Sequence, residues 1–405
     1  MIFISNKSTD YFIKTLLLTL CLFLSSSFAW FEDYLFNTRY LFLICLLFLT
    51  FKLKVHLLEF INYTISKKIS ADLFLIFIYL LQILIKQQIS FEYTSILLLY
   101  FFTKFIFFTF QKDKFMMEIS RNSLIFFGLI YLVGIYLGIF EIIFLNTDVF
   151  YELKPAFYPN YLANFLTKNG PINFSSFSLS YNYTAYILIA FISLVHVVNI
   201  PKKILILFFS YVGLFLTGAK IFYLYLSILL VLKVIKNKKL KIFFIVSLIF
   251  GYLLMSHFVI SDFENVQTGS KYFYGKIYQN SYIAIYESLF FNLKNIFINL
   301  FSSFNISEIS LNVFTIESKG LEPHSLMISL FLIGGIQLLL FGLFVIFSTI
   351  TKLLNEEDFD QKKKFLLSII IVFAVESLFL WDSYDSLLFW FILIIYPHLH
   401  KRTLN

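Results

Sequence analysis

Charged residues are scarce in this sequence. Asp, Glu, Lys and Arg make up only 14% of the 405 residues, whereas a soluble domain carries roughly 25%. A chain with so little charge cannot cover its surface with solvated groups in water, but a lipid environment needs no such cover. Apolar residues make up 60% of the chain and the mean hydropathy is +0.84. The composition therefore excludes an ordinary water-soluble fold.

Cysteines are few, and the common enzyme signatures are missing. The two cysteines, Cys21 and Cys45, both lie inside apolar runs and show neither a disulfide framework nor metal-ligand spacing. We interpret them as inert thiols. The sequence contains no P-loop, no GxGxxG after a strand, no HExxH and no serine elbow. ATP-driven transport and zinc chemistry therefore have no support, and we expect no metal or cofactor.

Long apolar runs dominate what is present. Runs of ~17–25 residues, the length that spans a bilayer, are rich in Phe, Leu and Ile and do not alternate with polar residues. This pattern is typical of transmembrane helices. We predict an all-α polytopic membrane protein, with residues 1–405 forming a single membrane domain and the first helix uncleaved rather than a signal peptide. The predicted spans are 12–30, 38–52, 69–86, 93–110, 121–145, 181–199, 203–218, 219–235, 240–260, 324–350, 364–381 and 385–397.

The basic residues predict the orientation. With the N-terminus in the cytoplasm, about two thirds of the 32 lysines and arginines fall on the inner side, as the positive-inside rule requires. The net charge of +8 then reflects topology, and no nucleic-acid partner is needed to explain it. Both termini are predicted to be cytoplasmic, with outer loops at 146–180 and 261–323. Apolar residues at helical spacing within 281–301 predict an interfacial helix in the larger loop.

Two segments at the outer ends of predicted spans resemble one family. FLTGAKIFYLYLSILL, which contains Lys220, resembles the "TGSR" hairpin of the O-antigen polymerase and O-antigen ligase superfamily. PHSLMISLFLIGGIQLLLFGLF, which contains His324, resembles that family's "HN-x-x-L…G-x-x-G" segment, and a large outer loop precedes it in both. SLSYNYTAY, which contains Asn182, is a weaker match to the entry of a middle helix.

Two departures of the sequence from this pattern bear on the chemistry. Lys220 stands where the family has an arginine, and Ser325 follows the histidine where the family has asparagine. Only three arginines occur in the chain, at positions 39, 121 and 402. Lysine holds a phosphate as a point charge and lacks the planar fork of arginine. Geometrically fixed recognition of a diphosphate is therefore not expected from arginine in this chain.

The resemblance implies a glycan polymerase of the bacterial inner membrane, acting on undecaprenyl diphosphate-linked oligosaccharides at its outer face. His324 would be the base or orient the acceptor, because histidine suits proton transfer near neutral pH, and Lys220 would stabilise the leaving diphosphate. Glu376, near the outer end of its span, is a candidate for facing a polar cavity. The remaining substrate-binding candidates are Lys271, Tyr272, Lys276, Glu322, Ser325 and Asn182.

Alternative functions stay open at this point. An O-antigen ligase, which transfers the glycan to lipid A–core, shares the same motifs. A lipid-linked oligosaccharide flippase also has about a dozen helices, although the long loop 261–323 argues against it, and neither inverted repeats nor broken helices indicate a secondary transporter. The bilayer and the lipid-linked glycan are the expected partners, and a regulator of chain length is a further partner that the resemblance leaves open. Lys104, inside the fourth span, is interpreted as a structural lysine that extends to the inner surface.

Overall fold

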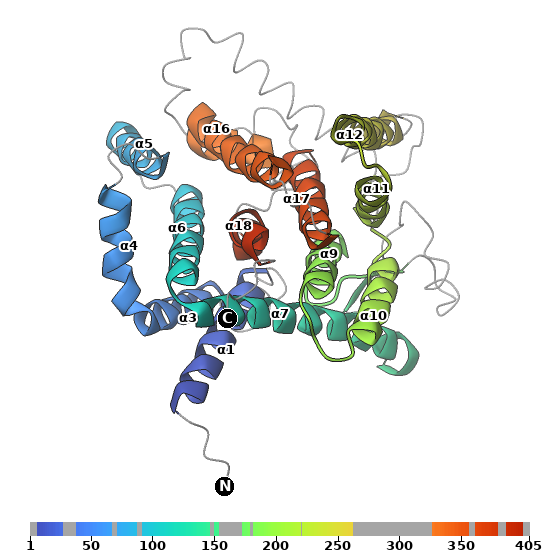
Figure 1. Ribbon diagram of the computed structural model, residues 1–405, viewed down its shortest axis with the longest axis horizontal. Helices are drawn as coiled ribbons and strands as arrows, with labels where there is room; N and C mark the ends of the chain where they lie inside the picture. Colours follow the sequence, from blue (N-terminus) through green and yellow to red (C-terminus); the bar gives the residue numbers. More distant parts are fainter. Residues whose placement is uncertain are drawn as a thin grey trace.

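The computed structural model describes residues 6–26, 38–66, 71–86, 91–145, 150–153, 172–178, 181–219, 221–261, 326–355, 361–379 and 386–399. These residues are almost entirely helical (Figure 1). The helices are α1 (Asn6–Ser26), α3 (Thr38–Lys52), α4 (Lys54–Ser66), α5 (Ala71–Lys86), α6 (Phe91–Lys112), α7 (Lys114–Phe140), η1 (Glu141–Leu145), α9 (Tyr181–Val197), α10 (Lys203–Leu216), α11 (Ile221–Val234), α12 (Lys238–Ser261), α16 (Leu326–Asn355), α17 (Gln361–Phe379), α18 (Leu387–Ile394) and η5 (Tyr396–His398). The strands β1 (Tyr151–Leu153) and β2 (Ile172–Phe174) form an antiparallel pair.

Each of the twelve predicted spans holds a helix, so the prediction of an all-α protein is confirmed. Four of the described helical stretches are long and apolar enough to cross a membrane, namely Thr9–Ser26, Tyr93–Lys112, Phe115–Leu145 and Ile333–Leu353. The pair α3 and α4 meets the same test jointly, although the two helices are bent by 89°. Five other apolar helices are shorter. Twelve complete crossings therefore stay a prediction.

Two helices, α18 and α9, are buried almost completely within the structure. α18 lies between α6, α16 and α17 in Figure 1, and every residue from Leu387 to Leu393 is buried. Trp390 of α18 packs edge-on against Tyr100 of α6, and Phe389 contacts Phe373 of α17. α9 is buried around nearly its whole circumference. Helices that are apolar on all faces belong in the interior of a larger assembly of helices.

The outer helices expose large apolar side chains. Phe51 is 66% exposed on α3, Leu84 77% on α5, Ile204 85% on α10 and Phe243 64% on α12. A water-soluble monomer rarely exposes apolar surface on this scale, because contiguous apolar patches drive association. Lipid chains cover such surface without cost. The distribution is that of a membrane-embedded protein.

Contacts between helices join ends that share a predicted side. Among the predicted inner ends, the guanidinium of Arg121 donates to the Leu399 carbonyl at 2.6 Å, and His196 stacks on Phe365 with ring centroids 3.9 Å apart. Among the predicted outer ends, the Leu387 N–H donates to the Ser25 hydroxyl at 3.3 Å. The side of the membrane on which each group of ends lies stays a prediction.

The described residues also contain elements that the sequence did not predict. β1 and β2 lie within the predicted loop 146–180, and α4 follows directly on α3. α16 is broken at Gly335, whose φ of 69° is not helical, while Gly334 packs against the ring of Tyr93. The loop 262–323, including the predicted interfacial helix at 281–301, lies outside the described residues.

Candidate functional site

The strand pair and the turn after β2 form a compact unit at the predicted outer face. The N–H groups of Ser175 and Ser176 both donate to the carbonyl of Phe150, each at 3.1 Å, and the Ser178 N–H donates to the Ser175 carbonyl. Ser176 has a φ of 53°, a left-handed conformation that is uncommon outside glycine and is kept where surrounding contacts enforce it. The backbone from 172 to 178 is therefore held in one tight shape.

Buried hydroxyl groups join this turn to two helices. The Ser176 hydroxyl donates to the Tyr131 carbonyl on α7 at 2.8 Å. The hydroxyls of Ser178 and Thr184 are 2.8 Å apart, and Thr184, in the first turn of α9, also donates to the Ser175 carbonyl. Each of these side chains is at most 3% exposed, namely those of Ser175, Ser176, Ser178 and Thr184. Buried polar groups that are paired in this way define a specific local structure.

Glycines on α7 make room for the turn. A Cβ at Gly134 would overlap the hydroxyl of Ser176, and one at Gly138 would press on the ring of Phe174. The two glycines are four residues apart and therefore lie on one face of α7. Glu141, at the π-helical end of this helix, is 2% exposed and accepts a hydrogen bond from the Phe150 N–H at 2.9 Å. The glycine face and this carboxylate position the strand pair on α7.

The turn between α10 and α11 carries the Thr217-Gly218-Ala219 part of the family-like motif. The Thr217 hydroxyl donates to the Leu214 carbonyl at 2.7 Å, and Gly218 adopts a φ of 67° that suits glycine. A Cβ at Gly218 would overlap Oδ1 of Asn173 on β2. The strand pair and the motif therefore meet at a direct contact between the Asn173 amide and Gly218.

Asn173 is unusual among the buried polar residues. Its side chain is completely buried, and neither Oδ1 nor Nδ2 has a hydrogen-bond partner within the part of the chain that the structure describes. Leaving such a group unsatisfied costs about 1–3 kcal/mol. Among the described residues, the Asn173 amide therefore keeps a donor and an acceptor available to a group outside them.

Most of the predicted site residues lie outside the described residues. These are Lys220, Lys271, Tyr272, Lys276, Glu322, His324 and Ser325. Lys220 directly follows the described turn at Ala219, and His324 precedes the start of α16 by two residues. Asn182 is exposed in the first turn of α9, beside the buried Tyr183, whose hydroxyl is 2.7 Å from that of Ser386. Glu376 belongs to α17, but its side chain is not described.

A second polar group lies between α5 and α6. Asp72 accepts a hydrogen bond from Tyr100 at 2.5 Å and pairs with the ammonium of Lys104 at 3.2 Å. The ring of Tyr100 packs in turn on Phe341 and Trp390. Lys104 therefore pairs with an acid on the neighbouring helix, and its extension to the inner surface stays a prediction.

Sequence reasoning missed Asn173 and its hydroxyl-bearing neighbours. The one available signal was the run Asn-Phe-Ser-Ser-Phe-Ser at 173–178, in which small polar residues alternate with aromatic ones. Within the described ranges no three His, Cys, Asp or Glu residues come together to hold a metal ion. No protein-family model, no curated protein and no solved structure matches the chain.

Proposed function

We propose that this protein is a membrane glycosyltransferase that polymerises oligosaccharide repeat units linked to undecaprenyl diphosphate. The product would be O-antigen or a related surface polysaccharide, made at the outer face of the bacterial inner membrane. The proposal rests on the resemblance of the segments around Lys220 and His324 to the O-antigen polymerase and ligase superfamily. The membrane-embedded, mostly helical fold is compatible with it.

One observation carries the proposal furthest. The amide of Asn173, which has no hydrogen-bond partner among the described residues, lies against Gly218. Gly218 belongs to the motif whose next charged residue is Lys220. A polymerase needs neutral hydrogen-bonding groups for sugar hydroxyls close to the cation that receives the diphosphate. An amide offers both a donor and an acceptor for this purpose. The contact thus supports a site for a glycan diphosphate at the turn between α10 and α11.

The reaction assigns a role to each candidate. His324 would take the proton from the hydroxyl of the incoming repeat unit, which then attacks the anomeric carbon of the growing chain. The bond between that carbon and the diphosphate oxygen breaks, and Lys220 would stabilise the charge on the departing undecaprenyl diphosphate. Lys271, Tyr272, Lys276, Glu322, Ser325, Asn182 and Glu376 would contact sugar or phosphate.

The same proposal includes the finer topology. The chain would cross the membrane about twelve times with both termini in the cytoplasm, and the loops 146–180 and 261–323 would lie outside. The grouping of helix ends supports this arrangement, since Arg121 contacts the C-terminal Leu399 while Ser25 contacts the start of α18 at Leu387. The buried turn at 175–178 would then face the outer leaflet.

The banding pattern of surface polysaccharide in a deletion strain tests the function. The deletion strain should make a single-repeat product, and the native chain should restore a ladder that His324→Ala and Lys220→Ala at equal expression do not restore. Loss of capped lipid A–core, with polymer accumulating on undecaprenyl diphosphate, would instead assign the ligase reaction. An unchanged ladder in the deletion strain would contradict both.

A further inference from the structure

α4 is a helix at the edge of the structure, beside α6 (Figure 1). Leu53 alone separates it from α3, and the axes of the two helices meet at an angle of 89°. Its buried face is anchored by Phe60, whose ring centroid is 5.6 Å from the rings of both Phe105 and Phe108 on α6. α4 runs lengthwise beside α6, because Glu59 pairs with Lys112 and, one turn further along, the ring of Tyr63 packs on Phe108.

A second face of α4 is apolar and uncovered. Val55 is 71% exposed, Leu58 70%, Ile61 42% and Ile65 63%. Their spacing of three and four residues places them on one side of the helix. In a membrane-embedded protein such a stripe contacts the acyl chains of lipids, because apolar side chains of this size are costly to leave in water.

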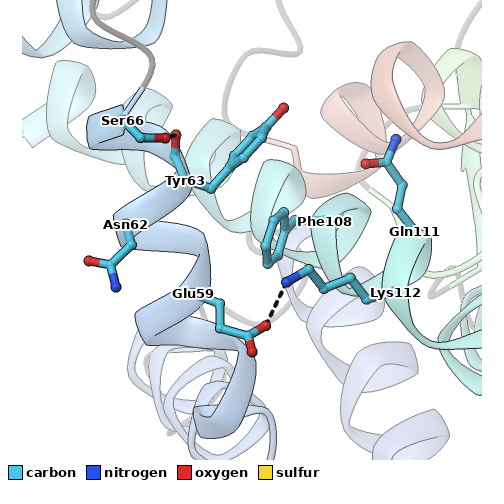
Figure 2. A pocket seen from close by; sticks show the side chains of 7 residues that line it. All are labelled: Glu59, Asn62, Tyr63, Ser66, Phe108, Gln111 and Lys112. Carbon is cyan, nitrogen blue, oxygen red and sulfur yellow. Dashed lines mark hydrogen bonds and ion pairs between the residues drawn. The ribbon is translucent and has the colours of Figure 1, made fainter.

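The third face of α4 borders a groove of about 510 Å³. α4 contributes Glu59, Asn62, Tyr63 and Ser66 to its lining, and α6 contributes Phe108, Gln111 and Lys112. Figure 2 shows Lys112 reaching from α6 toward Glu59 on α4, with the ring of Phe108 beside the ammonium group. The Lys112 Nζ lies 2.7 Å from Oε2 of Glu59 and 4.6 Å from the Phe108 ring centroid.

The groove therefore presents one anion and one cation side by side. Oε2 of Glu59 also lies 3.6 Å from Nδ1 of His56 on the same helix. Both side chains are about half exposed, at 45% for Lys112 and 49% for Glu59. An exposed ion pair contributes little to stability. A ligand that carries both an anion and a cation can therefore replace the Lys112–Glu59 pair with two ion pairs of its own, one to each side chain. The rings of Tyr63 and Phe108 add a surface that favours cations.

We propose that this groove binds the headgroup of phosphatidylethanolamine at the inner surface of the membrane. Lys112 would hold the phosphate and Glu59 the primary ammonium, while the acyl chains would lie along the stripe of Val55, Leu58 and Ile65. A headgroup with only a negative charge would draw Lys112 away from Glu59 and leave that carboxylate with only His56 nearby. A quaternary ammonium would offer Glu59 no N–H donor. Its placement at the inner surface rests on the proposed topology, whereas the headgroup site itself does not depend on the polymerase activity.

Native mass spectrometry of the full chain tests the headgroup. The chain is purified in detergent and supplied with equal amounts of phosphatidylethanolamine, phosphatidylglycerol and phosphatidylcholine. We expect phosphatidylethanolamine to be retained about five-fold over the other two, as for a single exposed ionic contact. Glu59→Gln and Lys112→Gln should each remove this preference. The matched controls Lys54→Gln and Glu118→Gln, exposed charges that do not line the groove, should keep it.

Two results would overturn the proposal. Equal retention of all three lipids is one. The other is preferred retention of phosphatidylglycerol that rises in Glu59→Gln, which would assign an anionic lipid instead.

A second measurement needs no variant: the native chain is offered phosphatidylethanolamine carrying none, one or two N-methyl groups. Retention should fall with each methyl group as N–H donors are lost, and a flat response would contradict the role of Glu59.

Discussion

The side-chain amide of Asn173 fills the space beside Gly218 in which any other residue would place its Cβ. The two residues belong to different segments, the strand β2 and the turn between α10 and α11. Their contact packs the strand pair against the turn that contains Thr217, Gly218 and Ala219. Four predictions follow from this contact and from the other buried polar groups.

Gly218→Ala should lower the free energy of unfolding by about 1–2 kcal/mol, because a non-glycine residue at a φ of 67° is strained. The new methyl group must also displace Asn173. Denaturant unfolding of the purified chain in detergent measures the effect. Gly251→Ala is the matched control, since nothing lies within 4 Å of its added Cβ and alanine favours the helix. Equal behaviour of the two variants would contradict the account of the turn.

Asn173→Leu separates a ligand-binding role from a structural one. The amide has no partner within the described part of the chain, so an apolar group of similar size should leave stability unchanged or raise it. The polysaccharide ladder should nevertheless be shortened or lost. Asn122→Leu should do the reverse, because Asn122 donates to the Tyr11 hydroxyl at 2.6 Å. A normal ladder with Asn173→Leu would show that the amide does not serve the reaction.

Glu141→Ala should destabilise the chain by about 1–3 kcal/mol, since it leaves the Phe150 N–H without this acceptor in a buried site. Glu141→Gln keeps an oxygen at the same position and should cost less than half as much. Thermal unfolding of both variants in detergent compares them. Equal losses would mean that the negative charge, and not the hydrogen bond, is what the strand pair requires.

Asp72 and Lys104 should be coupled energetically. Asp72 is only 16% exposed and Lys104 33%, so removing one charge leaves the other partly buried without its ion partner. We expect Lys104→Met and Asp72→Leu each to cost about 1–3 kcal/mol, and the double variant to cost less than the sum of the two. A double-mutant cycle of unfolding free energies measures the coupling. Strict additivity would contradict the ion pair.

The helices were predictable because local features define them. Apolar runs with a lysine at one end predict spans such as 69–86 and 203–218. The structure describes these two helices as Ala71–Lys86 and Lys203–Leu216. α4 was not predicted, since its sequence KVHLLEFINYTIS mixes polar and apolar residues and its stability comes from packing Phe60 on α6. Tertiary contacts of this kind leave no local pattern.

The candidate site was predictable only in part. Thr217 and Gly218 were assigned to an outer turn, and the structure describes a turn there. β1 and β2 are three residues each and distant in sequence, so their pairing could not be read from alternation. Burial of Asn173 depends on this pairing and on Gly218. The ion pair of Lys104 was equally unpredictable from the sequence, because its partner Asp72 lies on a neighbouring helix.

Reconstitution of the reaction tests the central claim most directly. The purified chain in liposomes would be supplied with repeat units linked to undecaprenyl diphosphate, and products and released undecaprenyl diphosphate would be counted. We predict a ladder of glycans with one undecaprenyl diphosphate released per bond formed, and loss of both with His324→Ala. Repeat units that remain single with the native chain, under conditions in which it is folded, would contradict the assignment as a polymerase.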